Sequence, residues 1–302
     1  MAEPSQPVPV RVSAILISRN QEQGARRAIQ ALEASPARAQ LQILLVDSGS
    51  SDGSGKLDEE FPNVTALRLQ KNFGVTRACN IAMRTASGEF ILFLDPRVEL
   101  APDAVSRMME RLDQDAEATA VCPLIQDTAG HIAVRTQGLP TFAELAAEYK
   151  SGIAAPPLLV NGAEYLTVEA PGWLALLVRR QFLQGMNWLD ARFGSYGAEL
   201  DLFAQIKRAN KKIRLLPAAK GLLHPGASSD PRGRVAEAAD RATGIIAYAG
   251  KHNGGSIGPR ISLSLWSLGR VLASLARPKD LGFEFQRFLG VVTGQRIDGT
   301  QE

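Results

Sequence analysis

The chain is poor in the residue types that mark several common classes of protein. It has two cysteines and three histidines among 302 residues. Cys79 and Cys122 lie far apart and match no metal-ligand spacing, so both are expected to be reduced core residues of a cytoplasmic protein. Aromatic residues make up only 6% of the chain and no known binding motif is present. Nucleic acid is therefore not an expected partner.

The sequence also lacks long hydrophobic runs. No stretch approaches the roughly 18 uncharged apolar residues that a membrane-spanning helix needs. Residues 1–9 contain three prolines and no basic start followed by an apolar run, which is unlike a signal peptide and predicts a flexible N-terminus. An apolar content of 45% is enough for one large domain, or one and a half. We expect a soluble or peripheral protein.

Charge is unevenly distributed along the chain. From Phe203 to the end there are 16 basic against 7 acidic residues, a net charge of +9. Residues 1–202 have 18 basic against 24 acidic residues, a net charge of −6. A basic last third suggests an anionic partner there, such as phosphates or a membrane surface, and the alternative is a set of solvated helix faces.

The first half alternates short apolar runs with helical patterns. Strands are expected at 12–17, 41–46, 64–69, 90–94 and 119–123, with helices at 22–34, 75–86 and 104–112 and a short one ending near residue 60. Such repetition predicts a parallel sheet with helices on both faces.

The rhythm breaks at residues 124–170, where turn-like pieces and no long periodic run predict an irregular region around a cleft. Residues 172–224 regain two strands, at 173–178 and 213–216, and a helix at 200–209. The tail is helical. Each of its helices has one apolar stripe, which either packs against the domain or lies on a membrane surface through residues 261–292. The stripes consist of Ile261, Leu265, Leu268, Leu272 and Leu275, then Leu281, Phe285, Phe288, Leu289 and Val292.

The most informative stretch is residues 43–52, Ile-Leu-Leu-Val-Asp-Ser-Gly-Ser-Ser-Asp. A buried strand ends there on Asp47, and a loop of small hydrogen-bonding residues follows. Ligands of open α/β sheets bind outside the carboxyl ends of the strands. A nucleotide-type ligand is therefore expected at this edge.

Several motifs recur in the order and spacing of one enzyme family. Residues 46–54 read Val-Asp-Ser-Gly-Ser-Ser-Asp-Gly-Ser, and residues 72–74, 78–80 and 86–89 read Asn-Phe-Gly, Ala-Cys-Asn and Ala-Ser-Gly-Glu. With the Ser-Arg-Asn end of the first strand, they resemble family 2 glycosyltransferases of the GT-A fold, an inverting class that uses nucleotide sugars. The resemblance covers roughly residues 10–230.

This resemblance implies an α/β fold with a mostly parallel, helix-flanked sheet and a nucleoside diphosphate sugar as donor. It implies that Asp47 contacts a uracil- or thymine-type base, with Asn20 and Asp52 nearby. For Asp47 the alternative is a turn or helix cap. The donor-binding residues expected from the matched motifs are Ser18, Asn20, Asp47, Ser50, Asp52, Asn72, Gly74, Asn80, Asp95 and Arg97.

One motif departs from the family. Residues 94–100 read Leu-Asp-Pro-Arg-Val-Glu-Leu, and Arg97 stands where the family's metal-binding Asp is found. A guanidinium carries only donors and cannot ligate a cation. Three interpretations remain open: the chain is an inactive relative, Arg97 itself stabilises the diphosphate, or Mg²⁺ or Mn²⁺ binds weakly through Asp95, with Glu99 as a substitute ligand.

The catalytic base of the family aligns with Glu199 in the segment 193–202, Phe-Gly-Ser-Tyr-Gly-Ala-Glu-Leu-Asp-Leu, in which Ala198 replaces the preceding acidic residue. Inverting transfer needs a carboxylate that takes the proton of the acceptor hydroxyl. Glu199 is either this base or a first-turn carboxylate favoured by the helix dipole. Asp201 is the second candidate.

Three further features come from the resemblance. His224 matches a family histidine near the metal and diphosphate, so Asp95 and His224 are the candidate metal ligands; a satisfied structural histidine is the alternative. Trp173 and Tyr196 either stack on an acceptor sugar or pack in the core. Residues 248–254, Tyr-Ala-Gly-Lys-His-Asn-Gly, resemble a stretch of rhamnosyltransferase-like members, which suggests lipid-linked or surface glycans as acceptors.

The expected organisation is a flexible N-terminus (1–9), a glycosyltransferase domain (10–230) with a nucleotide half (10–123) and an acceptor half (124–230), and a helical C-terminal extension (231–302). The expected function is transfer of a hexose-type sugar to a glycan or lipid-linked acceptor in cell wall or polysaccharide biosynthesis. The expected location is cytoplasmic, with peripheral contact at the inner membrane face as an option. The alternative is a catalytically silent nucleotide-sugar-binding or scaffold protein.

Overall fold

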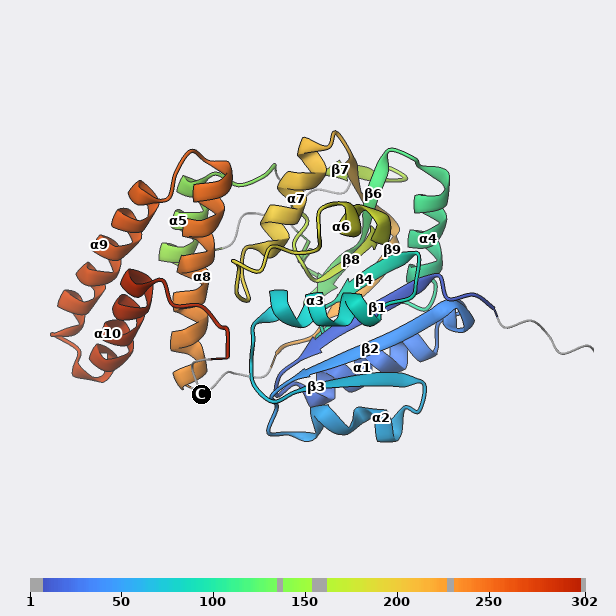
Figure 1. Ribbon diagram of the computed structural model, residues 1–302, viewed down its shortest axis with the longest axis horizontal. Helices are drawn as coiled ribbons and strands as arrows, with labels where there is room; N and C mark the ends of the chain where they lie inside the picture. Colours follow the sequence, from blue (N-terminus) through green and yellow to red (C-terminus); the bar gives the residue numbers. More distant parts are fainter. Residues whose placement is uncertain (1–7, 135–137, 154–161, 227–230, 300–302) are drawn as a thin grey trace, which may run out of the picture.

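The computed structural model describes residues 8–134, 138–153, 162–226 and 231–299 (Figure 1). Most of the expected N-terminal lead-in lies outside these ranges. The strands are β1 Val12–Ser18, β2 Leu41–Ser48, β3 Val64–Leu69, β4 Phe90–Leu94, β5 Val98–Leu100, β6 Ala118–Asp127, β7 Leu166–Val168, β8 Ala175–Arg179 and β9 Lys212–Leu223. The helices are α1 Glu22–Glu33, α2 Leu57–Glu60, α3 Val75–Thr85, α4 Ala104–Gln114, α5 Phe142–Ser151, α6 Arg180–Gly185, α7 Ala198–Arg208, α8 Pro231–His252, α9 Ile257–Ser274 and α10 Pro278–Thr293, and the short 3₁₀ turns are η1 Arg38–Gln40 and η2 Gly53–Lys56.

The strands form one mixed sheet in the order β3-β2-β1-β4-β8-β6-β9-β5, and β7 pairs with β9. The first four strands in this order are parallel to one another, as the alternating pattern predicts. From β8 onward the sheet becomes mixed, because β8 runs antiparallel to both β4 and β6. Helix α3 lies over one face of β1 and β2, and α1 lies behind them (Figure 1).

The core explains why these segments become strands and helices. The residues of β2 and β4 are nearly all buried, which is typical of strands covered on both faces. Helix α1 buries one stripe and leaves its other face polar; the stripe consists of Gly24, Ala25, Ala28, Ile29 and Leu32. Cys79 and Cys122 are buried and unbridged, as expected.

The region 124–170 contains a helix that the sequence analysis did not predict. Thr141 accepts a hydrogen bond from the backbone N–H of Glu144, and the Glu144 carboxylate accepts one in return from the Thr141 N–H, which forms a capping box. Gly152 ends the helix in a left-handed conformation. Helix α5 buries only Leu145 and Ala146, so its apolar periodicity is too weak to see in the sequence.

Helices α8, α9 and α10 pack beside the sheet domain (Figure 1). Helix α9 is oriented with its apolar stripe outward. Ile257, Ile261, Leu265, Leu268, Leu272 and Leu275 are between 38% and 77% exposed, whereas the side facing the protein buries Leu263, Ser267 and Ser274. The expectation that this stripe packs against the domain is therefore wrong for α9. No helix among the described residues is long and apolar enough to cross a membrane.

Candidate active site

The carboxyl edge of the parallel strands brings three polar segments together. In the sheet register Ser18 lies beside Asp47, and Leu16 of β1 lies beside Leu94 of β4. Because β1 is the middle strand, the segments that follow β1, β2 and β4 share one edge. This is the edge at which open α/β sheets bind ligands.

Asp47 is a carboxylate of this group that has one oxygen without a hydrogen-bond donor among the described residues. It is buried, at 7% exposure, and its Oδ2 accepts only a long contact of 3.4 Å from the Ser50 N–H. Its Oδ1 is buried and has no hydrogen-bond partner among the described residues. A buried carboxylate oxygen without a donor is costly. The cap role offered as an alternative accounts for one oxygen at most.

The other polar side chains of this edge shape the loop between β2 and α2. Asn20, which has a positive φ of 51°, accepts the Ser51 N–H at 2.8 Å through Oδ1 and donates its own N–H to Ser50 Oγ at 3.0 Å. Asp52 accepts the N–H of Ser54 at 2.9 Å and of Glu22 at 3.0 Å, and so caps the starts of η2 and α1. Ser18 Oγ donates to Ser54 Oγ at 3.2 Å.

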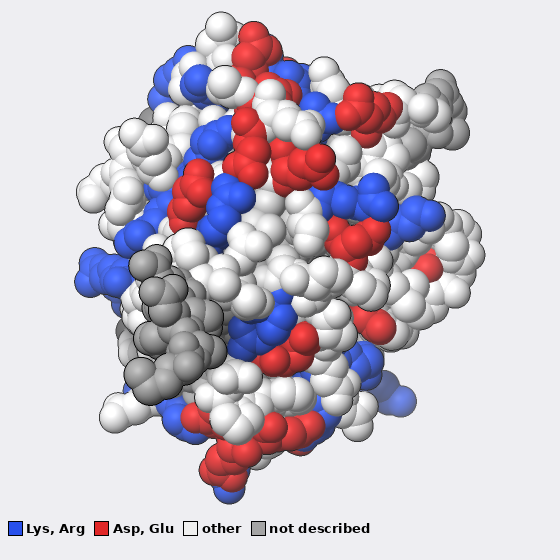
Figure 2. Space-filling view, turned by 90° about the vertical axis from the view of Figure 1, so that its right-hand side faces the viewer, with Lys and Arg blue, Asp and Glu red and all other residues white. Residues whose placement is uncertain are grey.

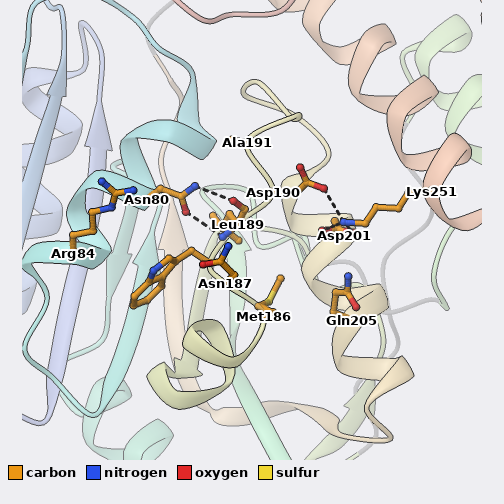
Figure 3. Close-up of a pocket in the computed structure, with 11 residues that line it drawn as sticks. Asn80, Arg84, Met186, Asn187, Leu189, Asp190, Ala191, Asp201, Gln205 and Lys251 are labelled. Carbon is orange, nitrogen blue, oxygen red and sulfur yellow. Dashed lines mark hydrogen bonds and ion pairs between the residues drawn. The ribbon is translucent and has the colours of Figure 1, made fainter.

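Asn72, Gly74 and Asn80 are engaged elsewhere. Asn72 Oδ1 accepts the Gly74 N–H at 3.0 Å, which turns the chain into α3. The Asn80 amide donates to the Leu189 carbonyl at 2.8 Å and accepts the Leu189 N–H at 3.1 Å, so it anchors a distant loop (Figure 3). This explains an Asn inside a helix, and it speaks against Asn80 as a donor ligand.

Arg97 lies at the rim of a pocket of about 470 Å³, together with Asn20, Asp52 and Gly226. Its Nε and Nη2 donate to the two oxygens of Asp95 at 2.9 and 2.7 Å, and this pairing raises the pKa of the guanidinium. Three of its five N–H hydrogens are left free by this pair. A substituent on Gly226 would meet the Arg97 side chain at 2.9 Å, so glycine lets the two segments approach.

Sequence reasoning missed a second cation in this pocket. Arg27 of α1 lines it, and its Nε is buried without a partner among the described residues. Arg27 could have been identified in the sequence by its position, because it lies in the first turns of the helix that follows β1 and directly beside the buried stripe of that helix.

The expected metal ligands do not form a metal site. Both oxygens of Asp95 are taken by Arg97, and His224 Nε2 lies 2.8 Å from the Glu99 carboxylate. Among the described residues no three His, Cys, Asp or Glu side chains are grouped to hold a metal ion. This donor set does not fit a divalent cation, because Glu99 binds the histidine and is not placed to rescue Asp95.

Glu199, the candidate base, lies in the first turn of α7. Its Oε2 accepts the Gly197 N–H at 2.8 Å, and the side chain is half-buried. Burial is the main factor that raises its pKa to about 7, and the nearby Asp240 carboxylate adds to the rise. A carboxylate with a pKa near neutrality is suited to accept and release a proton at physiological pH.

Asp201 is held by Lys251 and His252. Its side chain is 1% exposed, with Lys251 Nζ at 2.9 Å and His252 Nε2 at 2.6 Å. Figure 3 shows Lys251 reaching toward Asp201 and Asp190 from α8. This pairing speaks against Asp201 as a base. It also gives the Lys-His segment a structural task, which is to tie α8 to α7.

Of the two aromatic candidates for acceptor binding, Trp173 packs against Phe93 with ring centroids 4.5 Å apart. Tyr196 lies under the Arg241 guanidinium, 5.3 Å from its ring centroid. Both are half-buried, so each keeps a surface that a sugar can contact. Neither of them lines a second pocket of about 390 Å³, which lies between α3, α7 and the 186–191 loop (Figure 3).

The side of the molecule opposite α9 and α10 has no strong charge of one sign. Figure 2 shows acidic and basic side chains intermingled there. The excess of positive charge in the last third is therefore not gathered on this face.

A family model and a curated protein both resemble this chain. The model described as "Glycosyl transferase family 2" matches residues 13–153. A protein of Mycobacterium tuberculosis (strain H37Rv), N-acetylglucosaminyl-diphospho-decaprenol L-rhamnosyltransferase, is 28% identical over 79% of this chain and 86% of its own.

Two solved structures share the fold at low sequence identity. GalNAc-T7 with UDP, GalNAc and Mn²⁺ has a TM-score of 0.62 at 16% identity, over 80% of this chain and 47% of its own. A mannosyltransferase of Pyrobaculum calidifontis in complex with GDP-Man and Mn²⁺ has a TM-score of 0.55 at 14% identity, over 97% of this chain and 90% of its own.

Proposed function

We propose that the chain is a member of glycosyl transferase family 2 and that it transfers a sugar from a nucleoside diphosphate sugar to a lipid-linked or glycan acceptor, with inversion at the anomeric carbon. Its sheet and flanking helices form the GT-A fold that the motifs imply. The observation that carries the proposal is the carboxyl edge of β1, β2 and β4, where Asp47 has a buried oxygen without a partner among the described residues, and where Asn20 and Asp52 line a pocket together with Arg27 and Arg97.

We propose that Asp47 Oδ1 accepts a hydrogen bond from the N–H of a pyrimidine base. The loop around Asn20, Ser50 and Asp52 is held by its own hydrogen bonds, so it offers a preformed floor for the nucleoside. Ser18 lies behind this loop and supports it through Ser54.

For the diphosphate we propose a site built from side-chain cations. Arg97 and Arg27 both line the pocket. The pair with Asp95 leaves three Arg97 N–H hydrogens free, and Arg27 Nε is buried without a partner among the described residues. Guanidinium groups bind phosphate oxygens with good geometry and remain charged at any physiological pH. Because Asp95 holds Arg97 from two sides, the cation is fixed in place before the donor arrives. The metal that similar enzymes bind is then not needed to hold the leaving group.

Glu199 is the proposed base. As the acceptor oxygen attacks the anomeric carbon, the carboxylate takes its proton and the nucleoside diphosphate leaves from the opposite face. The developing negative charge on the diphosphate is stabilised by Arg97 and Arg27. The silent-scaffold alternative is not favoured, because the donor loop keeps its hydrogen bonds and Asp47 Oδ1 has no donor among the described residues.

We further propose that α9 and α10 contact an anionic membrane surface. Five apolar side chains of α9 and Leu275 directly after it are exposed, and Phe285, Leu289 and Val292 of α10 are exposed as well. Between residues 257 and 296 there are six basic and two acidic residues. An exposed apolar stripe with an excess of positive charge is typical of helices that lie at a lipid interface. A lipid-linked acceptor would be reached from there.

The proposed function is tested by a transfer assay with a panel of UDP, dTDP and GDP sugars and polyprenyl diphosphate-linked acceptors. The anomeric configuration of the product is read by NMR. Transfer from one donor, with inversion, is the expected result. Transfer with retention, or binding of all donors without transfer to any acceptor, would overturn the proposed reaction.

A further inference from the structure

A buried carboxylate outside the matched motifs ties three segments of the candidate active site together. Asp240 of α8 is 2% exposed. Its Oδ2 accepts the backbone N–H of Ser195 at 2.9 Å and of Tyr196 at 3.1 Å, in the loop that leads into α7. Its Oδ1 accepts the N–H of Ile297 at 2.8 Å. The loop before Glu199 and the C-terminal segment therefore share one anchor.

The packing around this anchor leaves no room for adjustment. A substituent on Gly194 would lie 1.8 Å from Asp240 Oδ1, so only glycine permits the contact. Thr76 Oγ1 donates to the Gly194 carbonyl at 2.6 Å, which joins the loop to the start of α3 on the donor side. Gly74, with a φ of +82°, lies against the Ile297 carbonyl, where an added carbon would be 2.5 Å away.

The C-terminal segment closes over this junction. Ile297 is buried, Arg296 donates to the Arg192 carbonyl at 2.7 Å, and Arg77 of α3 donates to the Asp298 carbonyl at 3.4 Å. Figure 1 shows the end of the described chain returning to α8. Residues 296–298 thus bridge the donor half and the loop before Glu199.

We infer that Asp240 is a positioning residue for the transfer reaction: it fixes the 194–197 loop, and through it Glu199, and locks the C-terminal segment across the same loop. This inference rests on the proposed role of Glu199 as base. The alternative is a carboxylate that only satisfies local backbone donors. A positioning role predicts that a change of Asp240 alters the placement and the pKa of Glu199, whereas a purely local role predicts no change at Glu199.

The charges around Glu199 give the direction of that change. Asp240 raises the pKa of Glu199, and Arg241 of α8 lowers it. Burial raises the pKa of Asp240 to about 6, and Arg296 of the C-terminal segment lowers it. Removing the negative charge of Asp240 therefore lowers the pKa of Glu199. A base works when deprotonated, so the acidic limb of kcat/KM moves to lower pH.

The tests use Asp240→Asn and Asp240→Ala in the full-length chain, with Asp103→Asn, a half-exposed carboxylate before α4, as the control. An Asn can keep its oxygen toward Ser195 and Tyr196, but it then turns its NH₂ toward the Ile297 N–H. We expect Asp240→Asn to lower kcat about 10- to 100-fold, as for misplaced catalytic groups. The donor KM should change less than threefold, and the acidic limb should shift downward.

Hydrogen exchange separates this inference from the proposed function, because it needs no activity. Asp240→Ala should remove protection at the amides of Ser195, Tyr196 and Ile297, and Asp240→Asn should remove it at Ile297 first. The control should match the wild type. Unchanged protection in both Asp240 variants would overturn the anchoring role. An unchanged pH profile and kcat in Asp240→Asn would overturn the positioning role. If the wild type transfers no sugar while hydrogen exchange in the Asp240 variants changes as expected, the proposed reaction is wrong and the anchoring role of Asp240 is supported.

Discussion

The donor side and the acceptor side of the candidate site differ in one carboxylate. On the donor side Asp47 keeps a buried oxygen without a partner among the described residues. On the acceptor side Asp201 is paired with Lys251 and His252, and Asp240 accepts three backbone N–H groups. The donor side thus has a carboxylate oxygen that can still accept a hydrogen bond. On the acceptor side the carboxylates near the half-buried Glu199 are already paired. Under the proposed roles, donor binding and proton transfer are carried by different residues.

The largest effect on kcat is expected from Glu199→Gln, which tests the acceptor side. The amide keeps the size of the side chain but cannot accept the proton, so kcat should fall about 10²- to 10⁴-fold. Donor affinity by calorimetry should stay within twofold of the wild type. In the wild type the pKa of about 7 predicts that kcat/KM rises as pH increases through 7, because the deprotonated form is active. An equal loss of donor binding and turnover would break the separation of the two sides.

The second largest effect is expected from Asp47→Asn, which tests donor binding by the unpaired Asp47 oxygen. Loss of a charge-assisted hydrogen bond costs about 1.5–3 kcal/mol, which weakens nucleoside diphosphate binding about 10- to 100-fold. The acidic limb of kcat/KM should keep its midpoint, since Asp47 is not the base. Calorimetry with UDP and dTDP measures the affinity. Full affinity in this variant would show that the open oxygen is not used.

A smaller effect is expected from the double change Leu265→Ser and Leu272→Ser on the exposed stripe of α9. Each leucine inserted into the interface contributes a share of the 1.5–3 kcal/mol of full burial, so binding to vesicles should weaken about tenfold. Flotation with vesicles containing phosphatidylglycerol measures it. Ile153→Ser, which removes an equally exposed apolar side chain near α5, is the matched control. A stripe that instead holds a second copy would show a concentration-dependent dimer and no flotation.

The place of Asp47, Asp52 and Asp95 at one edge of the sheet was predictable from the sequence because its determinants are local. Asp47, the loop to Ser54 and the Asp95-Arg97 pair follow strands whose apolar runs define the sheet edge. The acceptor side was not, because its partners are distant in sequence. Lys251 and His252 reach Asp201 from 50 residues away, and Asp240 holds a loop 45 residues earlier.

Two other misses have similar causes. The period of α9 reveals an apolar stripe but not the direction it faces, which depends on the Ser267 and Ser274 side packing inward. Helix α5 lacked a strong stripe and was identifiable only from its Thr141 and Glu144 capping box.

The most direct measurement concerns the cation at the donor site. Donor affinity is compared in EDTA and in Mn²⁺ for the wild type, Arg97→Ala and Arg97→Lys. With the diphosphate held by a fixed guanidinium, the wild type binds within twofold of the same affinity in both buffers. Arg97→Ala should lose at least tenfold, and Arg97→Lys should fall between them because it keeps the charge without the fork. A wild type that needs Mn²⁺ to bind, with Arg97→Ala unimpaired, would contradict this.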